Sequence, residues 1–167
     1  MTTLIALCHK GRPLVGVVTQ HFSEDNQYAP VCYYSHIEHP VHSMSLDSLQ
    51  GRVLAIAPVP SDRLDILVTS SRFNEILDRV TQVLGATSLI KQGGCGKKIL
   101  SVIQGTGQCY YYHKAGTSRW DTAAPEALLI SAGGVLTDIR GEHYDYSGEQ
   151  SLNETGVIAS GNKSVHA

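Results

Sequence analysis

Two short apolar runs open the chain, at residues 3–8 and 14–19. They flank a segment that contains Gly11 and Pro13, and such turn formers between apolar runs predict a β-hairpin. The next stretch, residues 23–51, is polar, rich in His, Pro and Ser, and has neither a helical nor a strand period. It predicts a long loop or a poorly packed insertion.

A clear helical stripe appears in the second third of the chain. Its apolar positions follow the i, i+3, i+4, i+7 spacing of an amphipathic helix and stop at Gly85; they are Phe73, Ile76, Leu77, Val80, Val83 and Leu84. A second helix is expected from about residue 96 to Gly105. A third is expected over residues 122–131, with Pro125 in its first turn.

Strand signals alternate with these helices. They fall at residues 52–57, 65–69, 108–113, 135–139 and 156–160. Such alternation predicts the α/β class, and the opening hairpin is expected to make the sheet mixed.

Composition narrows the class of ligand. With 167 residues, 42% of them hydrophobic, the chain is long enough for one domain with a core. A net charge of −2 and the lack of a Lys/Arg run argue against nucleic acid or an anionic membrane as partners, which leaves a small soluble ligand. The opening apolar run is too short for a membrane span. The four cysteines form neither metal-type pairs nor a disulfide framework, so we expect a reducing, cytoplasmic location.

Two segments could carry chemistry. Residues 93–98 read Gly-Gly-Cys-Gly-Lys-Lys before a helix; they could cradle a phosphate with backbone N–H groups and Lys98, or form a plain glycine turn with solvated lysines. Asp121 stands at the start of the third helix. It could cap that helix or offer an oxygen to Mg²⁺, and the residue types by themselves favour the cap.

The motif around Asp121 resembles the signature of a known superfamily. Residues 120–127, Trp-Asp-Thr-Ala-Ala-Pro-Glu-Ala, followed by Gly133 and Gly134, resemble the C-terminal signature of the inositol monophosphatase superfamily, in the form found in 3'(2'),5'-bisphosphate nucleotidases. Segments 11–20, 69–72, 93–99, 136–139 and 156–160 agree in order and spacing. The similarity spans nearly the whole chain and is weakest over residues 23–51.

The resemblance implies a phosphomonoesterase that removes the 3'-phosphate of adenosine 3',5'-bisphosphate with Mg²⁺ as cofactor. It makes Asp121 a metal ligand. The positions that match substrate contacts are Ser71, Gly94, Lys98 and Arg119, the last in place of a lysine. Phe73 and Asn74 stand where the family has a Ser and a ligand-contacting His, and Lys97 stands where Asn is common.

The same resemblance places the family's upstream Glu and Asp-Pro-Leu-Asp-Gly-Thr motif before Met1. No catalytic residue is therefore expected within this chain, which we expect to be the C-terminal part of a phosphatase and inactive alone. Two alternatives stay open: an inositol polyphosphate 1-phosphatase, and a non-catalytic truncated protein that binds a nucleotide or another subunit.

The implied fold is the layered α/β sandwich of the sugar phosphatases. Residues 1–50 would supply the end of an N-terminal sheet and a loop, and residues 51–167 a C-terminal α/β subdomain, together one partial domain. An exposed sheet edge is expected, and with it self-association.

Two other groups of side chains attract notice. The cluster His36, Glu38, His39 and His42 matches no established metal spacing, so we expect a solvated loop there. The run Tyr110, Tyr111 and Tyr112 could stack on a base. Because side chains alternate along a strand, at least one of the three is expected in the core.

Overall fold

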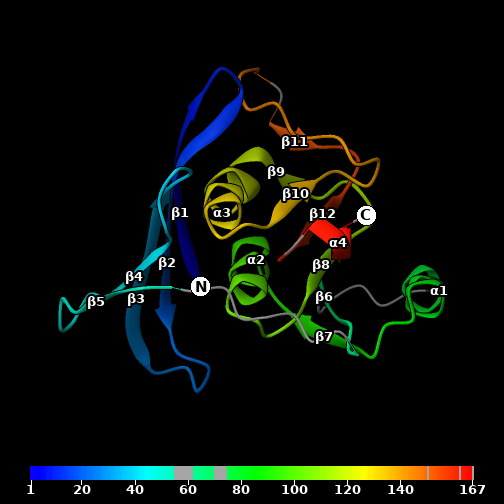
Figure 1. Ribbon diagram of the computed structural model, residues 1–167, viewed down its shortest axis with the longest axis horizontal. Helices are drawn as coiled ribbons and strands as arrows, with labels where there is room; N and C mark the ends of the chain where they lie inside the picture. Colours follow the sequence, from blue (N-terminus) through cyan, green and yellow to red (C-terminus); the bar gives the residue numbers. More distant parts are fainter. Residues whose placement is uncertain (55–61, 70–74, 150, 162, 167) are drawn as a thin grey trace.

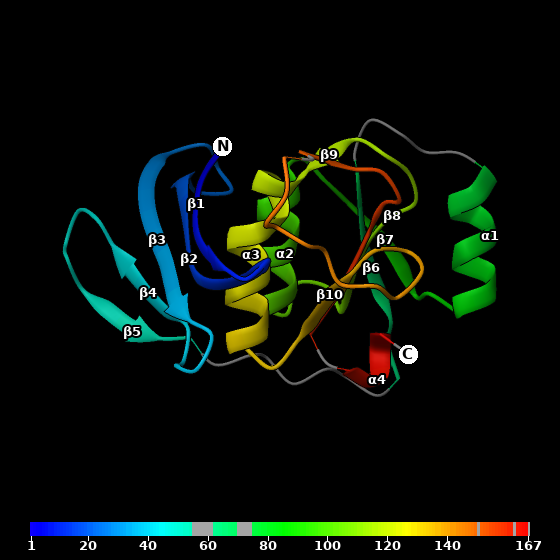
Figure 2. The same ribbon diagram turned by 90° about the horizontal axis from the view of Figure 1, so that it is seen from above.

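The computed structural model describes residues 1–54, 62–69, 75–149, 151–161 and 163–166. Two five-stranded sheets enclose a layer that contains the helices α2 (Cys95–Ile103) and α3 (Arg119–Ser131) (Figures 1 and 2). The helices α1 (Glu75–Leu84) and α4 (Lys163–His166) lie on the outer side of the second sheet (Figure 2). This layered α/β arrangement confirms the predicted fold class.

The first sheet is antiparallel throughout, with the strands in chain order. Its members are β1 (Thr2–His9), β2 (Arg12–Phe22), β3 (Tyr28–His36), β4 (His42–Ser45) and β5 (Gly51–Val53). The opening hairpin is thus confirmed, whereas the loop expected over residues 23–51 is wrong. Tyr33 and Ser43 in that stretch are buried, because successive side chains of β3 and β4 point to opposite faces of the sheet, and Val41 just before β4 is buried as well.

The second sheet is mixed and has the strand order β10-β12-β8-β6-β7. Its strands are β6 (Asp65–Thr69), β7 (Ser88–Gln92), β8 (Cys109–Tyr112), β10 (Val135–Thr137) and β12 (Val157–Ser160). β6 pairs in parallel with β7 and β8, while β12 pairs antiparallel with β8 and β10. Parallel and antiparallel pairing therefore occur together among the strands of this sheet. The opening hairpin, which was expected to make the sheet mixed, pairs with β3 in the first sheet instead.

The helices follow the predictions with shifted ends. α3 begins at Arg119, three residues earlier than expected, so Pro125 lies in its second turn. The early start is explained by Asp121, whose Oδ2 accepts a 2.8 Å hydrogen bond from the Ser118 backbone N–H and fixes the first turn. Because Pro125 has no backbone N–H, the Asp121 carbonyl does not receive the usual helical hydrogen bond from this position.

Some strand ends also differ from the prediction. β10 stops at Thr137, because Asp138 turns the chain by accepting hydrogen bonds from the N–H groups of Arg140 and Glu142 at 2.8 and 2.9 Å. β7 was not anticipated. A small ladder of β9 (Thr117–Ser118) and β11 (Leu152–Asn153) also forms beside the start of α3. Of the strand expected over residues 52–57, residues 55–57 lie outside the described part.

The core lies where the two sheets meet α2 and α3. It includes Val18 and Tyr33 from the first sheet, Ile99, Leu100, Ala124 and Leu128 from the helices, and Leu67, Tyr110 and Leu136 from the second sheet. Gly16 lets β2 approach α3 closely, since a Cβ there would lie 2.3 Å from the Ala124 carbonyl oxygen. Within the described residues, no helix is long and apolar enough to cross a membrane.

A charge pair between the partly exposed Arg12 and the buried Glu126 ties the tip of the opening hairpin to α3. Glu126 is fully buried and accepts hydrogen bonds from the Arg12 guanidinium and the Tyr146 hydroxyl. Arg12 also donates to the Tyr144 carbonyl at 2.6 Å, and the Tyr146 N–H donates to the Gly11 carbonyl at 2.9 Å. The hairpin tip is thereby held against both α3 and the loop that follows β10.

Candidate phosphate-binding pocket

A polar pocket of about 220 Å³ opens where the ends of β6 and β8 meet the starts of α2 and α3. Three of the five predicted site residues line it, namely Gly94, Lys98 and Asp121. They come from segments that are far apart in sequence, and the sheet brings them together. The remaining lining residues are Thr69, Cys95, Tyr110, Tyr112, Gly116 and Thr117.

The glycine segment is shaped by its backbone. Gly94 precedes α2 with φ 77°, a left-handed conformation that glycine adopts without strain. Among the residues that the structure describes, no side chain caps the N-terminus of α2, so the N–H groups of its first turn face the pocket end of the helix without such a partner. An anion at this position would be stabilised by those groups and by the helix dipole.

Lys98 is the buried cation of the pocket, with only 2% of its surface exposed. Its ammonium group donates hydrogen bonds to the carbonyls of Gly94 at 3.0 Å and Gln92 at 3.4 Å, and lies 4.6 Å from the centre of the Tyr110 ring. Burial lowers the pKa of Lys98, while Cys95 and Asp121 act in the opposite direction. The solvated-lysine interpretation therefore does not hold for Lys98.

Asp121 serves the helix and the pocket at once. Its Oδ2 accepts the Ser118 N–H, so the capping interpretation is confirmed in part, although Asp121 is the third residue of the helix and not its cap. Among the described residues, no hydrogen bond reaches Oδ1. One carboxylate oxygen thus remains available on the pocket side.

Burial favours the protonated forms of the Cys95 thiol and the Tyr110 phenol in the pocket. Burial raises the pKa of Cys95 to about 12, against a smaller lowering effect of Lys98, so the thiol stays protonated near neutral pH. Burial also raises the pKa of Tyr110. Tyr110 and Tyr112 are buried, which confirms that part of the tyrosine run belongs to the core.

The other two predicted substrate contacts are Ser71 and Arg119. Ser71 lies outside the described residues, as do Phe73 and Asn74. Arg119 lines a separate polar pocket of about 430 Å³, together with Asp138, Asn153 and Thr155. The Arg119 assignment stays a prediction.

Several pocket residues carried no signal strong enough to single them out. Thr69 ends a predicted strand, and Thr117 precedes the Trp-Asp pair by three positions. Gly116 has φ 143°, and a Cβ there would lie 2.5 Å from the Tyr112 hydroxyl. Because the loop that contains Gly116 approaches β8 so closely, this position requires a glycine. The loop lies beside Lys98 only because β8 pairs with its neighbouring strands in the second sheet.

The donor set fits a phosphate better than a complete metal centre. Lys98 and the α2 amides are donors and Asp121 is an acceptor, which suits an anion bound beside a shared cation. Within the described residues, no group of three or more His, Cys, Asp or Glu side chains could hold a metal. That statement includes His36, Glu38, His39 and His42. There, His36 Nδ1 lies 3.9 Å from a Glu38 carboxylate oxygen, and the His36 and His39 rings lie 5.6 Å apart.

Comparisons with known proteins agree with the fold and the motifs. The model of the inositol monophosphatase family matches residues 1–167. Human 3'(2'),5'-bisphosphate nucleotidase 1 is 28% identical over 171 residues, which cover 95% of this chain and 50% of that protein. The chain therefore spans about half the length of this relative.

Solved structures share the fold. CysQ from Bacteroides thetaiotaomicron has a TM-score of 0.75 at 20% identity, covering 97% of this chain and 63% of that one. Staphylococcal SaIMPase-II, solved bound to inositol monophosphate, has a TM-score of 0.71 at 16% identity, covering 99% and 59%. The same enzyme has been solved bound to 2'AMP. At these identities the structural likeness shows the fold alone.

Proposed function

Because the chain belongs to the inositol monophosphatase family, we propose that it carries the phosphate-binding half of a Mg²⁺-dependent phosphomonoesterase that acts on adenosine 3',5'-bisphosphate. The observation that carries the proposal is the meeting of Gly94, Lys98 and Asp121 in one pocket. These three residues were expected at the site from the motifs. Gly94 precedes α2, Lys98 lies on α2, and Asp121 lies on α3.

Each group has a part in this proposal. The Lys98 ammonium and the first-turn amides of α2 bind and orient the phosphate. Asp121 offers Oδ1 to the cation while the Ser118 N–H holds Oδ2 in place. The family is metal-dependent, typically with Mg²⁺, and bound Mg²⁺ supplies water activation and charge neutralisation. Asp121 fits as one ligand of a cation shared with the substrate phosphate, so further ligands must come from outside the described residues.

The nucleotide is favoured over an inositol phosphate by the similarity to the human nucleotidase. Inositol polyphosphate remains the second candidate, since SaIMPase-II has been solved bound to inositol monophosphate as well as to 2'AMP. A reducing, cytoplasmic location fits the four free cysteines, although a mouse relative, 26% identical over 96% of this chain and 42% of its own length, is a Golgi-resident 3'-phosphatase.

The test is phosphate release from adenosine 3',5'-bisphosphate and from inositol 1,4-bisphosphate, with and without Mg²⁺. We expect Mg²⁺-dependent release from the nucleotide by protein that carries the family's upstream metal motif, and loss of that release in Asp121→Asn. We expect the chain alone to bind the nucleotide without turning it over. Faster turnover of the inositol substrate would replace the nucleotide assignment, and a chain that binds neither substrate would overturn the proposal.

Self-association through the first sheet is part of the same proposal. β1 is the edge strand, and its Ile5 and Leu7 side chains are 63% and 61% exposed. A long apolar edge favours pairing with another chain. We expect the double variant Ile5→Lys, Leu7→Lys to shift the chain towards monomer in sedimentation velocity. A parent protein that is already monomeric across the concentration range would contradict this expectation.

A further inference from the structure

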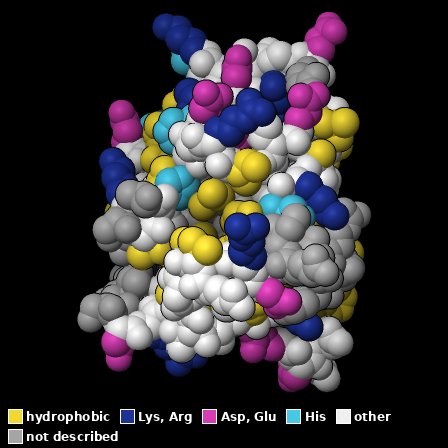
Figure 3. All heavy atoms as spheres, turned by 90° about the vertical axis from the view of Figure 1, so that its right-hand side faces the viewer, with side chains coloured by type: hydrophobic (Ala, Val, Ile, Leu, Met, Phe, Trp, Pro, Cys, Tyr) yellow, Lys and Arg dark blue, Asp and Glu magenta, His cyan; other side chains and the backbone are white. Residues whose placement is uncertain are grey.

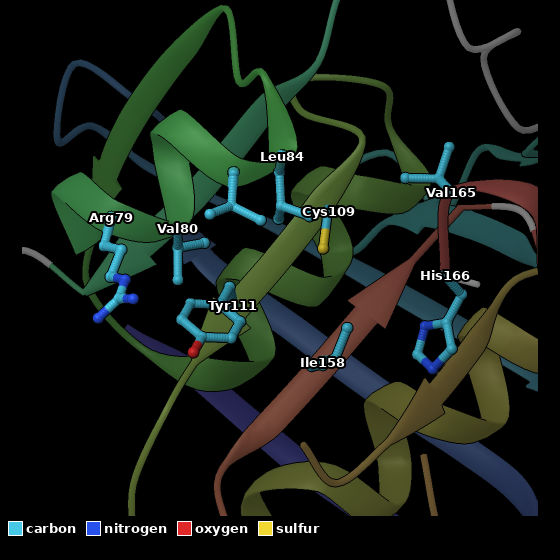
Figure 4. A pocket seen from close by; sticks show the side chains of 9 residues that line it. Arg79, Val80, Leu84, Cys109, Tyr111, Ile158, Val165 and His166 are labelled. Atoms are coloured by element: carbon cyan, nitrogen blue, oxygen red, sulfur yellow. The ribbon is translucent and has the colours of Figure 1, made fainter. Parts of the chain in front are cut away.

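An apolar pocket lies on the outer side of the second sheet, away from the phosphate pocket. Its volume is about 510 Å³, within the range of about 300–1,000 Å³ typical of small-ligand sites. Its walls come from α1, the strands β8 and β12, and α4 (Figure 4). On this face of the molecule, hydrophobic side chains gather near the middle with basic side chains beside them (Figure 3).

The helix α1 leaves much apolar surface uncovered above the sheet. Val83 and Leu84 line the pocket, yet 77% and 53% of their surfaces are exposed. The opposite wall is apolar as well, with Cys109 and Ile158 on neighbouring strands. A bound apolar group would remove both walls from water at once, which is the favourable term for ligands of this class.

One end of the pocket is polar and positively charged. The Arg79 guanidinium and the Tyr111 hydroxyl lie at the same end (Figure 4). Within the described part of the chain Arg79 has no ion pair, and no Asp or Glu lines the pocket. Asp78 precedes Arg79 on α1, but adjacent helical residues point in different directions.

The imidazole at the pocket, that of His166, already has hydrogen-bond partners. Its two ring nitrogens lie 2.8 Å from the Thr137 hydroxyl and 3.1 Å from the Ser160 hydroxyl. Burial, with a smaller effect of His143, lowers the pKa of His166, so the ring is neutral near pH 7. Arg79 is therefore the charge that a ligand would meet.

From the apolar walls and the single basic end, we infer that this pocket binds a small amphipathic anion, with an apolar chain or ring between α1 and the sheet and an acid group at Arg79 and Tyr111. Complementary charge selects an anion over a neutral or cationic amphiphile. The inference is independent of the phosphate pocket and of the proposed phosphatase activity.

The test uses decanoate as the probe, titrated into the full chain by isothermal titration calorimetry, with decylammonium as the partner of opposite charge. We expect saturable 1:1 binding of decanoate and at least about tenfold weaker binding of decylammonium. Arg79→Gln should weaken decanoate binding by about five-fold, as for a partly solvated ion pair. The matched control Arg52→Gln, an exposed arginine on the first sheet, should change nothing.

The variant Val83→Glu provides a second, independent test of the inference. Because Val83 is mostly exposed, the variant is expected to fold, which a thermal melt verifies. Its carboxylate would repel the ligand and wet the apolar wall, so decanoate binding should fall by about tenfold or more. Equal binding of decanoate and decylammonium, or unchanged binding by folded Val83→Glu, would overturn the inference. It would also be overturned if decanoate did not bind and Val83→Glu instead dissociated a dimer, since this face would then be a contact between copies.

Discussion

Replacing Lys98 with methionine is expected to weaken the binding of adenosine 3',5'-bisphosphate by about thirty-fold or more. The reason is that a buried ammonium group facing a phosphate contributes on the order of 2 kcal/mol or more, and methionine keeps the length of the side chain without its charge. The measurement is isothermal titration calorimetry in the presence of Mg²⁺.

The neighbouring lysine provides the control. Lys97 does not line the pocket, whereas Lys98 does. Lys97→Met should therefore bind the nucleotide as the parent does. If the two variants lost the same affinity, the effect would come from overall charge, and the assignment of Lys98 as a phosphate contact would be wrong.

Replacing Arg12 with methionine is expected to lower the free energy of unfolding by about 3–5 kcal/mol, because it leaves a buried carboxylate without its cation. Glu126 is fully buried, and its remaining hydrogen bond comes from the Tyr146 hydroxyl. Urea denaturation at pH 7 measures the loss. Arg52→Met, on an exposed arginine of the same sheet, should cost little.

Two further results separate the unpaired charge from lost packing. The double variant Arg12→Met, Glu126→Gln removes the buried charge and should recover most of the stability. Burial raises the pKa of Glu126, while Tyr146 and then Arg12 oppose that rise. Without Arg12 the pKa rises further, so the stability lost by Arg12→Met should be largest above that pKa and shrink as the pH falls and Glu126 takes up a proton. A loss that stayed constant with pH would point to packing alone.

Local patterns were sufficient for some of the regular elements of this chain. The apolar stripe that ends at Leu84 predicted α1, and the second helix was expected from about residue 96 to Gly105, close to the observed α2, because helix periods and left-handed ends are properties of neighbouring residues. The loop predicted over residues 23–51 was wrong, because the strands there depend on contacts with distant residues. The inward face of β3 packs on α3, and the sequence contains no local sign of that partner.

The candidate site, too, was predicted in part from the sequence and decided in part by the fold. The motifs themselves indicated Gly94, Lys98 and Asp121, through the glycine-lysine run and the Trp-Asp pair. No local pattern indicates that Lys98 is buried above Tyr110, or that Asp121 uses one oxygen for its own helix. It also placed Arg119 in the same group, whereas the fold directs that side chain to a different pocket.

The sequence by itself thus determined the α/β class, the elements with strong local periods and the family, and it predicted three residues that meet in the candidate phosphate-binding pocket. Only the tertiary structure decided the pairing of the hairpin with β3, the burial of Glu126 beside Arg12, and the basic apolar pocket under α1. The physical reason is that these features join segments separated by tens of residues, so their energies depend on contacts that form only when the two sheets close around α2 and α3.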